Sequence, residues 1–229
     1  MDEALKMARM AVADGISTMV ATPHQKMAQW PNEHKEIAHA AGVFDAWLQK
    51  EQIPLTLHYA AEIHLGPKTA SMLRQGRAPL LNLPDAQGEG RIPTLLLEFP
   101  HQGVRPGTAY MVELLVQQGY RPLIAHPERI RTFREDLNAL EPYIAMGCLS
   151  QITAASLTGG FGEAVGQVAD ELLKRGWAHI IASDGHRLHK RQPVIKDGVK
   201  LAAQLVGQDQ AEAMVTHHPW ALLQGKTLD

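Results

Sequence analysis

The 229-residue sequence has little of several features that assign a protein chain to a class directly. It has a single cysteine, Cys148, which excludes a disulfide bond within the chain. No apolar run approaches the length that spans a membrane. Basic and acidic residues nearly balance, so the formal charge is 22 − 24 = −2. A charge this small provides no global field that would attract nucleic acid or an anionic membrane.

What remains is the composition of an ordinary globular protein. Hydrophobic residues make up 45% of the chain and charged residues 20%, as is typical of soluble domains. The first ten residues, MDEALKMARM, do not have the pattern of a signal peptide, and we expect a cytoplasmic protein that is not inserted in a membrane. Cys148 lies at the start of an expected strand and is interpreted as a small buried residue, not as a nucleophile. The histidine count is unusual, because the chain has twelve histidines but only four each of Phe, Tyr and Trp.

Short apolar runs rich in β-branched residues alternate with longer helical patterns. The expected strands are residues 17–22, 55–63, 94–99, 121–126, 148–156 and 179–184. The expected helices are residues 2–14, 32–52, 106–118, 134–146, 163–175 and 194–206, followed by one more helix and a turn in residues 208–225. Several of the helical patterns end at a glycine, which commonly terminates a helix.

This alternation predicts an α/β protein with a parallel sheet or barrel. No Ser-rich linker or break in composition interrupts the chain, so residues 1–229 are expected to form one domain. The Gly/Pro-rich residues 76–91 are expected to form an internal loop. Six strands is an unusual number for a closed barrel of this type. The chain also opens with a helix that has no strand before it.

Residues able to bind a metal gather at the ends of five of the six expected strands. They are His24, Glu62 (with His64 just after it), Glu98, His126, Asp184 and His186. Parallel α/β proteins carry their chemistry at the carboxyl ends of the strands. Carboxylate oxygens and imidazole nitrogens without a thiolate suit hard or borderline divalent metals. The pattern therefore predicts a metal site.

Each of these residues also has a structural interpretation when it is taken alone. His24 fits a loop, His126 fits a satisfied core histidine, and Asp184 fits a turn. Glu98 fits an outward-facing strand residue, although it would be costly to bury without a partner. Their shared position at strand ends favours the metal site. The other histidines are interpreted as solvated or structural: His34, His39, His58, His101, His179, His189, His217 and His218.

Several carboxylates that converge with several imidazoles predict more than one metal, because a bridging glutamate needs two cations to balance it. Clusters of two or three metals commonly hydrolyse phosphate esters, since they lower the pKa of a bound water and clamp the phosphoryl oxygens. Guanidinium groups pair bidentately with phosphate. Arg129, together with Arg187 or Arg191, follows a strand end that carries candidate ligands, although each also fits a solvated surface charge.

Five short motifs, taken in this order, resemble the polymerase-and-histidinol-phosphatase (PHP) superfamily. They are TPH at residues 22–24, AAEIH at 60–64, LLLEF at 95–99, IAHPER at 124–129 and ASDGH at 182–186. The sequence is most similar to the bacterial manganese-dependent tyrosine phosphatases of capsule and exopolysaccharide synthesis, and the similarity extends through essentially the whole chain. Glu98 supports this branch, because other branches of the superfamily commonly have His at that position.

The resemblance implies a distorted (β/α)7 barrel with up to three Mn²⁺ ions at the carboxyl ends of its strands. By this resemblance Glu62 would bridge two metals. Glu98 and His126 would bind one of them, and Asp184 would bind the other. The third metal would be held by the two remaining candidate ligands, His24 and His186.

The same resemblance implies a substrate and two catalytic residues. Arg129 and Arg191 would bind the substrate phosphate, with Arg187 as the reserve candidate. The implied substrate is a phosphotyrosine-bearing protein, namely the tail of the cytosolic tyrosine kinase that controls polysaccharide chain length. The residues themselves do not indicate tyrosine. The sequence does not determine whether the chain forms a homo-oligomer.

The sequence departs from the family pattern at its beginning. The family begins with a strand that carries His-x-His and an Asp-Asp-Gly loop, whereas this sequence starts at Met1, inside or just before the first helix. We therefore expect a barrel of six strands that lacks the first, with at most partial metal binding and weak or no activity as written. Two alternatives stay open: a PHP phosphoesterase that acts on a small metabolite such as histidinol phosphate, and a non-catalytic remnant.

Overall fold

Strands and helices alternate along the computed structural model, which describes residues 1–26, 29–84 and 90–228. The strands are β1 (Thr18–Ala21), β2 (His24–Gln25), β3 (Thr56–Tyr59), β4 (Glu62–His64), β5 (Thr94–Glu98), β6 (Arg121–Ala125), β7 (Leu149–Thr153) and β8 (Ile180–Ala182). The helices are α1 (Asp2–Asp14), α2 (His34–Lys50), α3 (Thr69–Arg74), α4 (Thr108–Gln117), α5 (Arg131–Glu135), α6 (Glu141–Ala145), α7 (Ala154–Leu157), α8 (Glu163–Lys174), α9 (Lys196–Val206), α10 (Gln208–Ala213) and α11 (His217–Gln224), with short 3-10 helices η1 (Pro127–Arg129) and η2 (Leu137–Leu140).

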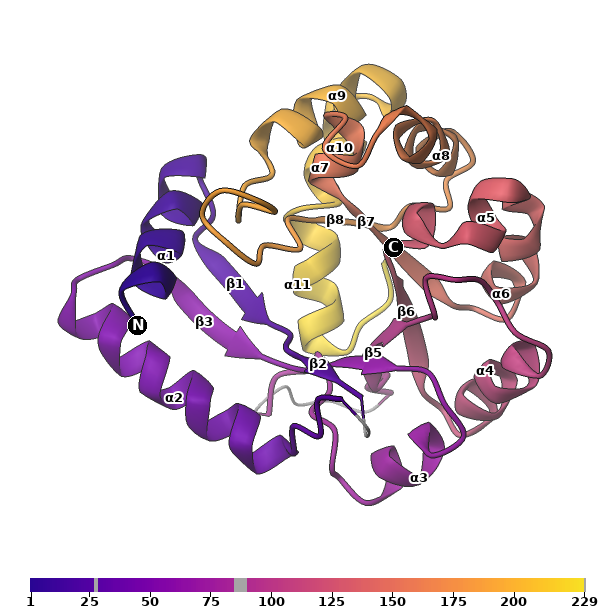
Figure 1. The fold of residues 1–229 in the computed structure, drawn as a ribbon, viewed down its shortest axis with the longest axis horizontal. Helices are drawn as coiled ribbons and strands as arrows, with labels where there is room; N and C mark the ends of the chain where they lie inside the picture. Colours follow the sequence, from indigo (N-terminus) through magenta and orange to yellow (C-terminus); the bar gives the residue numbers. More distant parts are fainter. Residues whose placement is uncertain (27–28, 85–89, 229) are drawn as a thin grey trace.

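The strands form two parallel sheets. β1 pairs with β3, and the larger sheet has the order β2-β4-β5-β6-β7-β8. Parallel neighbours need a crossover connection, and helices supply it here. Figure 1 shows α1, α2, α4, α8 and α9 arranged around the outside of the strands. The predicted α/β fold with a parallel sheet is confirmed.

Two expected strands are each divided into two short ones. The run 17–22 becomes β1 and β2, and the run 55–63 becomes β3 and β4. Pro23 lies between β1 and β2 and has no N–H group to donate to a neighbouring strand. At the second break the Ala61 amide donates to the carbonyl of Pro79 at 3.2 Å, outside the strand pairing. The prediction of two continuous strands is therefore wrong, and each chain segment passes from the small sheet to the large one.

Alternate residues of the strands serve two different apolar layers. On β5, Leu95 and Leu97 pack in a cluster with residues of α4 and α8, whereas Leu96 belongs to an inner cluster. The inner cluster includes Leu222 of α11, so this helix packs on the inner face of the strands (Figure 1). Glu98 lies two residues after Leu96 on the same strand and therefore faces the inner side. The inner face thus changes from apolar to charged at the end of β5.

One expected helix, residues 134–146, is wrong as a single element. The structure has α5, η2 and α6 in this region. Asp136 interrupts the helix, because its backbone is extended (φ −148°, ψ 104°) and its side chain accepts a hydrogen bond from the Asn138 amide at 3.0 Å. Pro142 then lies in the first turn of α6, where its missing N–H group costs no helical hydrogen bond.

Smaller differences concern where elements begin and end. Within the expected strand 148–156, strand β7 ends at Thr153 and helix α7 follows it. Within the expected strand 179–184, only the three residues of β8 are in a strand. Helix α3 has no counterpart among the expected elements. The expected loop 76–91 contains no helix or strand in its described part, and residues 85–89 lie outside the described residues. Within the described ranges, no helix combines the length and the apolar character needed to cross a membrane.

A buried carboxyl group holds the turn that follows β6. The chain leaves β6 through His126, whose φ of 36° is left-handed, and enters η1. Glu128 of η1 is fully buried, and its Oε1 atom accepts hydrogen bonds from the Thr153 amide at 2.9 Å and the Ser156 hydroxyl at 2.8 Å. Burial raises the pKa of Glu128. This carboxyl group ties η1, and with it His126 and Arg129, to the corner between β7 and α7.

Replacing Glu128 with alanine is expected to lower the free energy of unfolding by about 2–5 kcal/mol, because it opens a cavity and leaves two buried donors without an acceptor. Glu128→Gln keeps the volume and the acceptor oxygen, so we expect a loss below about 1.5 kcal/mol. Urea unfolding of both variants beside the wild type measures the difference. Equal losses for the two variants would show that the acceptor oxygen does not hold the turn.

Candidate active site

The six predicted metal ligands meet on the inner face of the large sheet. They are His24 opposite Glu62 in the register of β2 and β4, Glu98 at the end of β5, His126 after β6, and Asp184 and His186 after β8. The ring of His24 lies 5.8 Å from that of His186, centroid to centroid. The Nδ1 atom of His186 is 3.6 Å from Oδ1 of Asp184. Residues from five strand ends, separated by up to 162 positions in sequence, thus form one cluster.

Glu62 lies at the centre of this cluster, with a histidine next to each carboxylate oxygen. The Nδ1 atom of His24 is 2.8 Å from Oε2, and the Nε2 atom of His126 is 2.9 Å from Oε1. Glu62 itself is 4% exposed. Burial raises the pKa of Glu62, but contacts with His126 and His24 outweigh burial and hold the pKa at about 2. In return, contact with Glu62 raises the pKa of His24.

Glu98 forms a second centre beside Glu62. The Nδ1 atom of His64 is 3.2 Å from Oε2 of Glu98, and the Nε2 atom of His101 is 3.4 Å from Oε1. His24 connects the two centres, because its Nδ1 atom is also 3.8 Å from Oε2 of Glu98. Burial raises the pKa of Glu98, but His101 and His64 outweigh it and hold the pKa well below its usual range. Both glutamates therefore stay charged although they are buried close together.

Among the residues that the structure describes, two overlapping groups of side chains have the geometry to hold a cation. The ligand atoms of each group lie within 4.8 Å of one another, and the groups are Glu98 with His101 and His126, and Glu98 with His24 and Glu62. The Nδ1 atom of His126 is buried and has no partner among the described residues, which is uncommon for a core nitrogen that binds nothing. These donors fit a hard or borderline divalent metal.

Asp184, the third carboxylate of the cluster, is paired with two arginines. Arg129 Nη1 and Arg191 Nη2 both donate to its Oδ2 atom. Asp184 and Arg191 have left-handed backbones, with φ of 49° and 56°, which are uncommon for residues other than glycine. The amide of His186 donates to the carbonyl of Arg191 at 2.7 Å and closes the loop that returns Arg191 to the site.

The structure also distinguishes the two arginines that this loop offers. The side chain of Arg191 is partly buried against Asp184. Arg187 is exposed, and its side chain contacts no carboxylate in the part of the chain that the structure describes. The geometry therefore favours Arg191 over Arg187 as the partner of Arg129.

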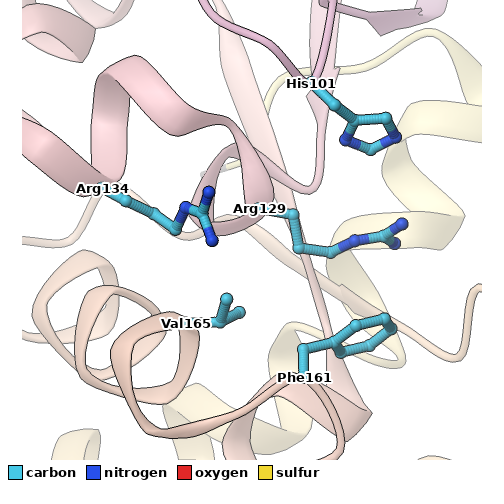
Figure 2. A pocket seen from close by; sticks show the side chains of 5 residues that line it. All are labelled: His101, Arg129, Arg134, Phe161 and Val165. Atoms are coloured by element: carbon cyan, nitrogen blue, oxygen red, sulfur yellow. The ribbon is translucent and has the colours of Figure 1, made fainter.

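An open pocket begins beside the cluster (Figure 2). It is lined by His101, Arg129, Arg134, Phe161 and Val165. The guanidinium carbon of Arg129 lies 4.5 Å from the centre of the Phe161 ring, a cation–π contact. Phe161 follows two glycines and precedes a third in the loop between α7 and α8, and Gly159 and Gly162 have positive φ values of 81° and 88°. These backbone angles let the short loop turn and present Phe161 to Arg129.

Part of this arrangement has no counterpart among the residues that the sequence pattern predicts. His101 is expected to be solvated or structural, yet its ring stacks on His126 with centroids 5.2 Å apart and its Nε2 atom faces Glu98. A signal exists for His64, because it lies two residues after Glu62 on a strand and therefore faces the same side. His101 follows Pro100 outside any strand, so strand spacing cannot predict it. Phe161 gives no signal beyond its glycine-rich surroundings.

Comparison with known proteins finds phosphatases of similar sequence and structure. Tyrosine-protein phosphatase YwqE of Bacillus subtilis is 31% identical over 226 residues, which cover 99% of this chain and 85% of that protein. Tyrosine-protein phosphatase CpsB of Streptococcus pneumoniae is 27% identical over 217 residues, covering 90% and 83% of the two chains. A crystal structure from work on YwqE and CpsB, described as unique metal-dependent tyrosine phosphatases, matches with a TM-score of 0.89 and 31% identity, over 99% of this chain and 88% of that one.

A family match covers nearly the whole sequence. Residues 1–224 match the family described as capsular polysaccharide synthesis, CpsB/CapC. The match confirms the resemblance to capsule-associated tyrosine phosphatases that the five sequence motifs indicate. The chain belongs to the CpsB/CapC family.

Proposed function

We propose that this chain is a metal-dependent phosphatase that removes the phosphoryl group from phosphotyrosine on proteins. The observation that carries the proposal is the position of two carboxylate–imidazole centres, at Glu62 and Glu98, beside the pair of arginines on Asp184. Metal ions and guanidinium groups together satisfy the charge of a phosphate monoester. The names of the relatives as tyrosine-protein phosphatases, and the metal dependence of the solved ones, support the same reaction.

In this proposal the six strand-end residues would hold up to three divalent ions, with Mn²⁺ as the expected metal. Glu62 would serve with Glu98 and His126 at one ion and with Asp184 at a second. His24 and His186 would serve the third. When bound, such ions lower the pKa of a water molecule and neutralise charge on the phosphoryl oxygens. His64 and His101 orient Glu98 through their contacts with its two oxygens.

Arg129 and Arg191 bind the phosphoryl oxygens of the substrate. Without a metal, both guanidinium groups neutralise the carboxylate of Asp184. A cation held by Asp184 would neutralise part of the same carboxylate, so both guanidinium groups would be available to phosphate. Their fixed N–H groups orient the phosphate and stabilise its charge while the bond to the tyrosine oxygen breaks. Phe161 keeps the guanidinium of Arg129 in place from one side.

We infer that the substrate is the phosphotyrosine-bearing tail of a bacterial tyrosine kinase that regulates capsular or exopolysaccharide synthesis, and that the reaction takes place in the cytoplasm. The description of the family as capsular polysaccharide synthesis proteins supports this partner. We further propose that the chain forms one domain with the distorted barrel of the PHP superfamily. The row of six adjacent parallel strands, with helices around its outside, supports that architecture (Figure 1).

The direct test is hydrolysis of a phosphotyrosyl peptide by the purified chain, with and without Mn²⁺. Phosphate release, even if weak, should depend on the metal and stop when a chelator is added. Histidinol phosphate serves as the comparison substrate. Faster hydrolysis of histidinol phosphate would replace the proposed substrate, and no hydrolysis of either compound by the metal-loaded chain would favour a non-catalytic role.

Matched variants of two glutamates extend this test to the metal site. Glu98 belongs to both candidate cation groups, whereas Glu113 is exposed on α4 and accepts a hydrogen bond from Gln117. Glu98→Gln is expected to lower metal content and phosphotyrosine hydrolysis on the order of 100-fold, because a charged ligand is lost. Glu113→Gln should keep both. Elemental mass spectrometry measures the metal, and full metal content in Glu98→Gln would contradict the ligand assignment.

Variants of the two arginines test phosphate binding separately from metal binding. Arg129→Ala and Arg191→Ala are each expected to lower kcat/KM about 10- to 1,000-fold, because charge-assisted hydrogen bonds to the phosphoryl group are lost. Metal content should stay unchanged in both variants. Arg187→Ala, in the same loop as Arg191 but exposed, is the control and should keep wild-type kinetics. Normal kinetics in both site variants would assign these arginines to a structural role on Asp184.

The pKa of His24 predicts how pH affects metal binding. Contact with Glu62 raises this pKa above its ordinary value of 6.5 in the metal-free protein. A protonated imidazole cannot bind a metal, so metal affinity should fall as the pH drops through the raised pKa and level off above it. An NMR titration of the His24 ring in the metal-free protein measures the pKa directly. In Glu62→Gln the pKa should decrease, and a pKa that is the same in both proteins would exclude Glu62 as the cause.

A further inference from the structure

The pocket beside the candidate metal centre contains a second guanidinium group. Arg129 comes from η1 and Arg134 from α5, and Phe161 and Val165 form the apolar part of the wall. Figure 2 shows Arg134 to the left of Arg129 and His101 above it, with Val165 below Arg134 and Phe161 below Arg129. A ligand that extends from the phosphate position at Arg129 along this pocket therefore comes to Arg134.

The two arginines differ in what balances their charge. Arg129 is paired with Asp184, which the mechanism already uses. In the described part of the chain, the side chain of Arg134 forms no hydrogen bond and no ion pair, and no carboxylate lines the pocket. The acidic residue next to it in sequence is not available, because Glu135 is bound by Arg131 at 2.7 Å. The pocket thus carries a positive charge that the protein does not neutralise.

We propose that Arg134 is a second anion-binding subsite, which recognises a carboxylate or phosphate on a side chain next to the phosphotyrosine of the substrate. The inference rests on the proposed function and adds a preference for acidic or multiply phosphorylated segments. Guanidinium groups bind both kinds of anion through paired N–H donors. The partly buried ring of Phe161 gives the substrate an apolar surface beside Arg129.

The alternative for Arg134 is an ordinary solvated charge on the surface of α5. An exposed arginine that only faces water does not change the choice between substrates. A subsite changes the ratio of kcat/KM between acidic and neutral substrates, and it does so less as salt screens the interaction. The ratio and its salt dependence therefore separate the two roles.

The experiment compares three peptides with the metal-loaded protein. Each has one central phosphotyrosine, flanked on both sides by alanine, by glutamate or by phosphotyrosine. We expect the wild type to prefer the glutamate and phosphotyrosine flanks, and Arg134→Ala to lower that preference about fivefold, mainly through KM. The peptide with the larger loss identifies whether carboxylate or phosphate is the better ligand. Arg134→Glu should reverse the preference, so that alanine flanks are hydrolysed better than glutamate flanks.

Arg105→Ala is the control, because it removes an exposed positive charge that does not line the pocket and leaves the Arg131–Glu135 pair in place. It should retain the wild-type preference, and circular dichroism of all variants checks that α5 is intact. An unchanged preference in Arg134→Ala and Arg134→Glu, with normal hydrolysis of the alanine-flanked peptide, would overturn the subsite and leave the proposed function in place. No hydrolysis of any peptide by the wild type would overturn both.

Discussion

The candidate active site depends on keeping two neighbouring carboxylates charged inside the fold. A buried carboxylate costs several kcal/mol when it is unpaired, and a second one nearby raises the pKa of the first. Glu62 and Glu98 nevertheless have lowered pKa values. His126 and His24 contact the oxygens of Glu62, and His101 and His64 contact those of Glu98. This is the same ligand chemistry that a divalent metal requires, so the contacts that balance the two carboxylates also suit a metal.

Strand register places these groups, and apolar packing fixes the register. Because side chains alternate along a strand, a shift of one residue would turn Glu98 into the layer of Leu95 and Leu97 and would send those leucines toward the site. Leu222 of α11 covers the inner face below the charged groups, next to Leu96. The apolar layers therefore permit one register, and that register brings His64 opposite Glu98.

The sequence predicts the site better than it predicts the individual elements. Residues such as Glu98 and His126 follow buried strands, and parallel strands place their ends together, so their convergence could be predicted from order alone. The division of the run 55–63 depends on the Ala61–Pro79 hydrogen bond, which is a contact between distant segments. His101 likewise reaches the site through a loop, where no periodic pattern constrains the direction of a side chain. Features set by tertiary contacts of this kind leave no local signal.

Charge balance connects the metal centre to the substrate. The carboxylates of Glu62, Glu98 and Asp184 carry three negative charges, and Arg129 and Arg191 supply two positive ones at Asp184. In the metal-free protein, contact with Glu62 raises the pKa of His24, which favours a proton that offsets the remaining charge. Divalent ions at the proposed ligands would displace such a proton and leave an excess of positive charge that includes both guanidinium groups. A phosphate dianion would reduce this excess. Metal and phosphate are therefore expected to strengthen each other's binding, and by linkage the effect is the same in both directions.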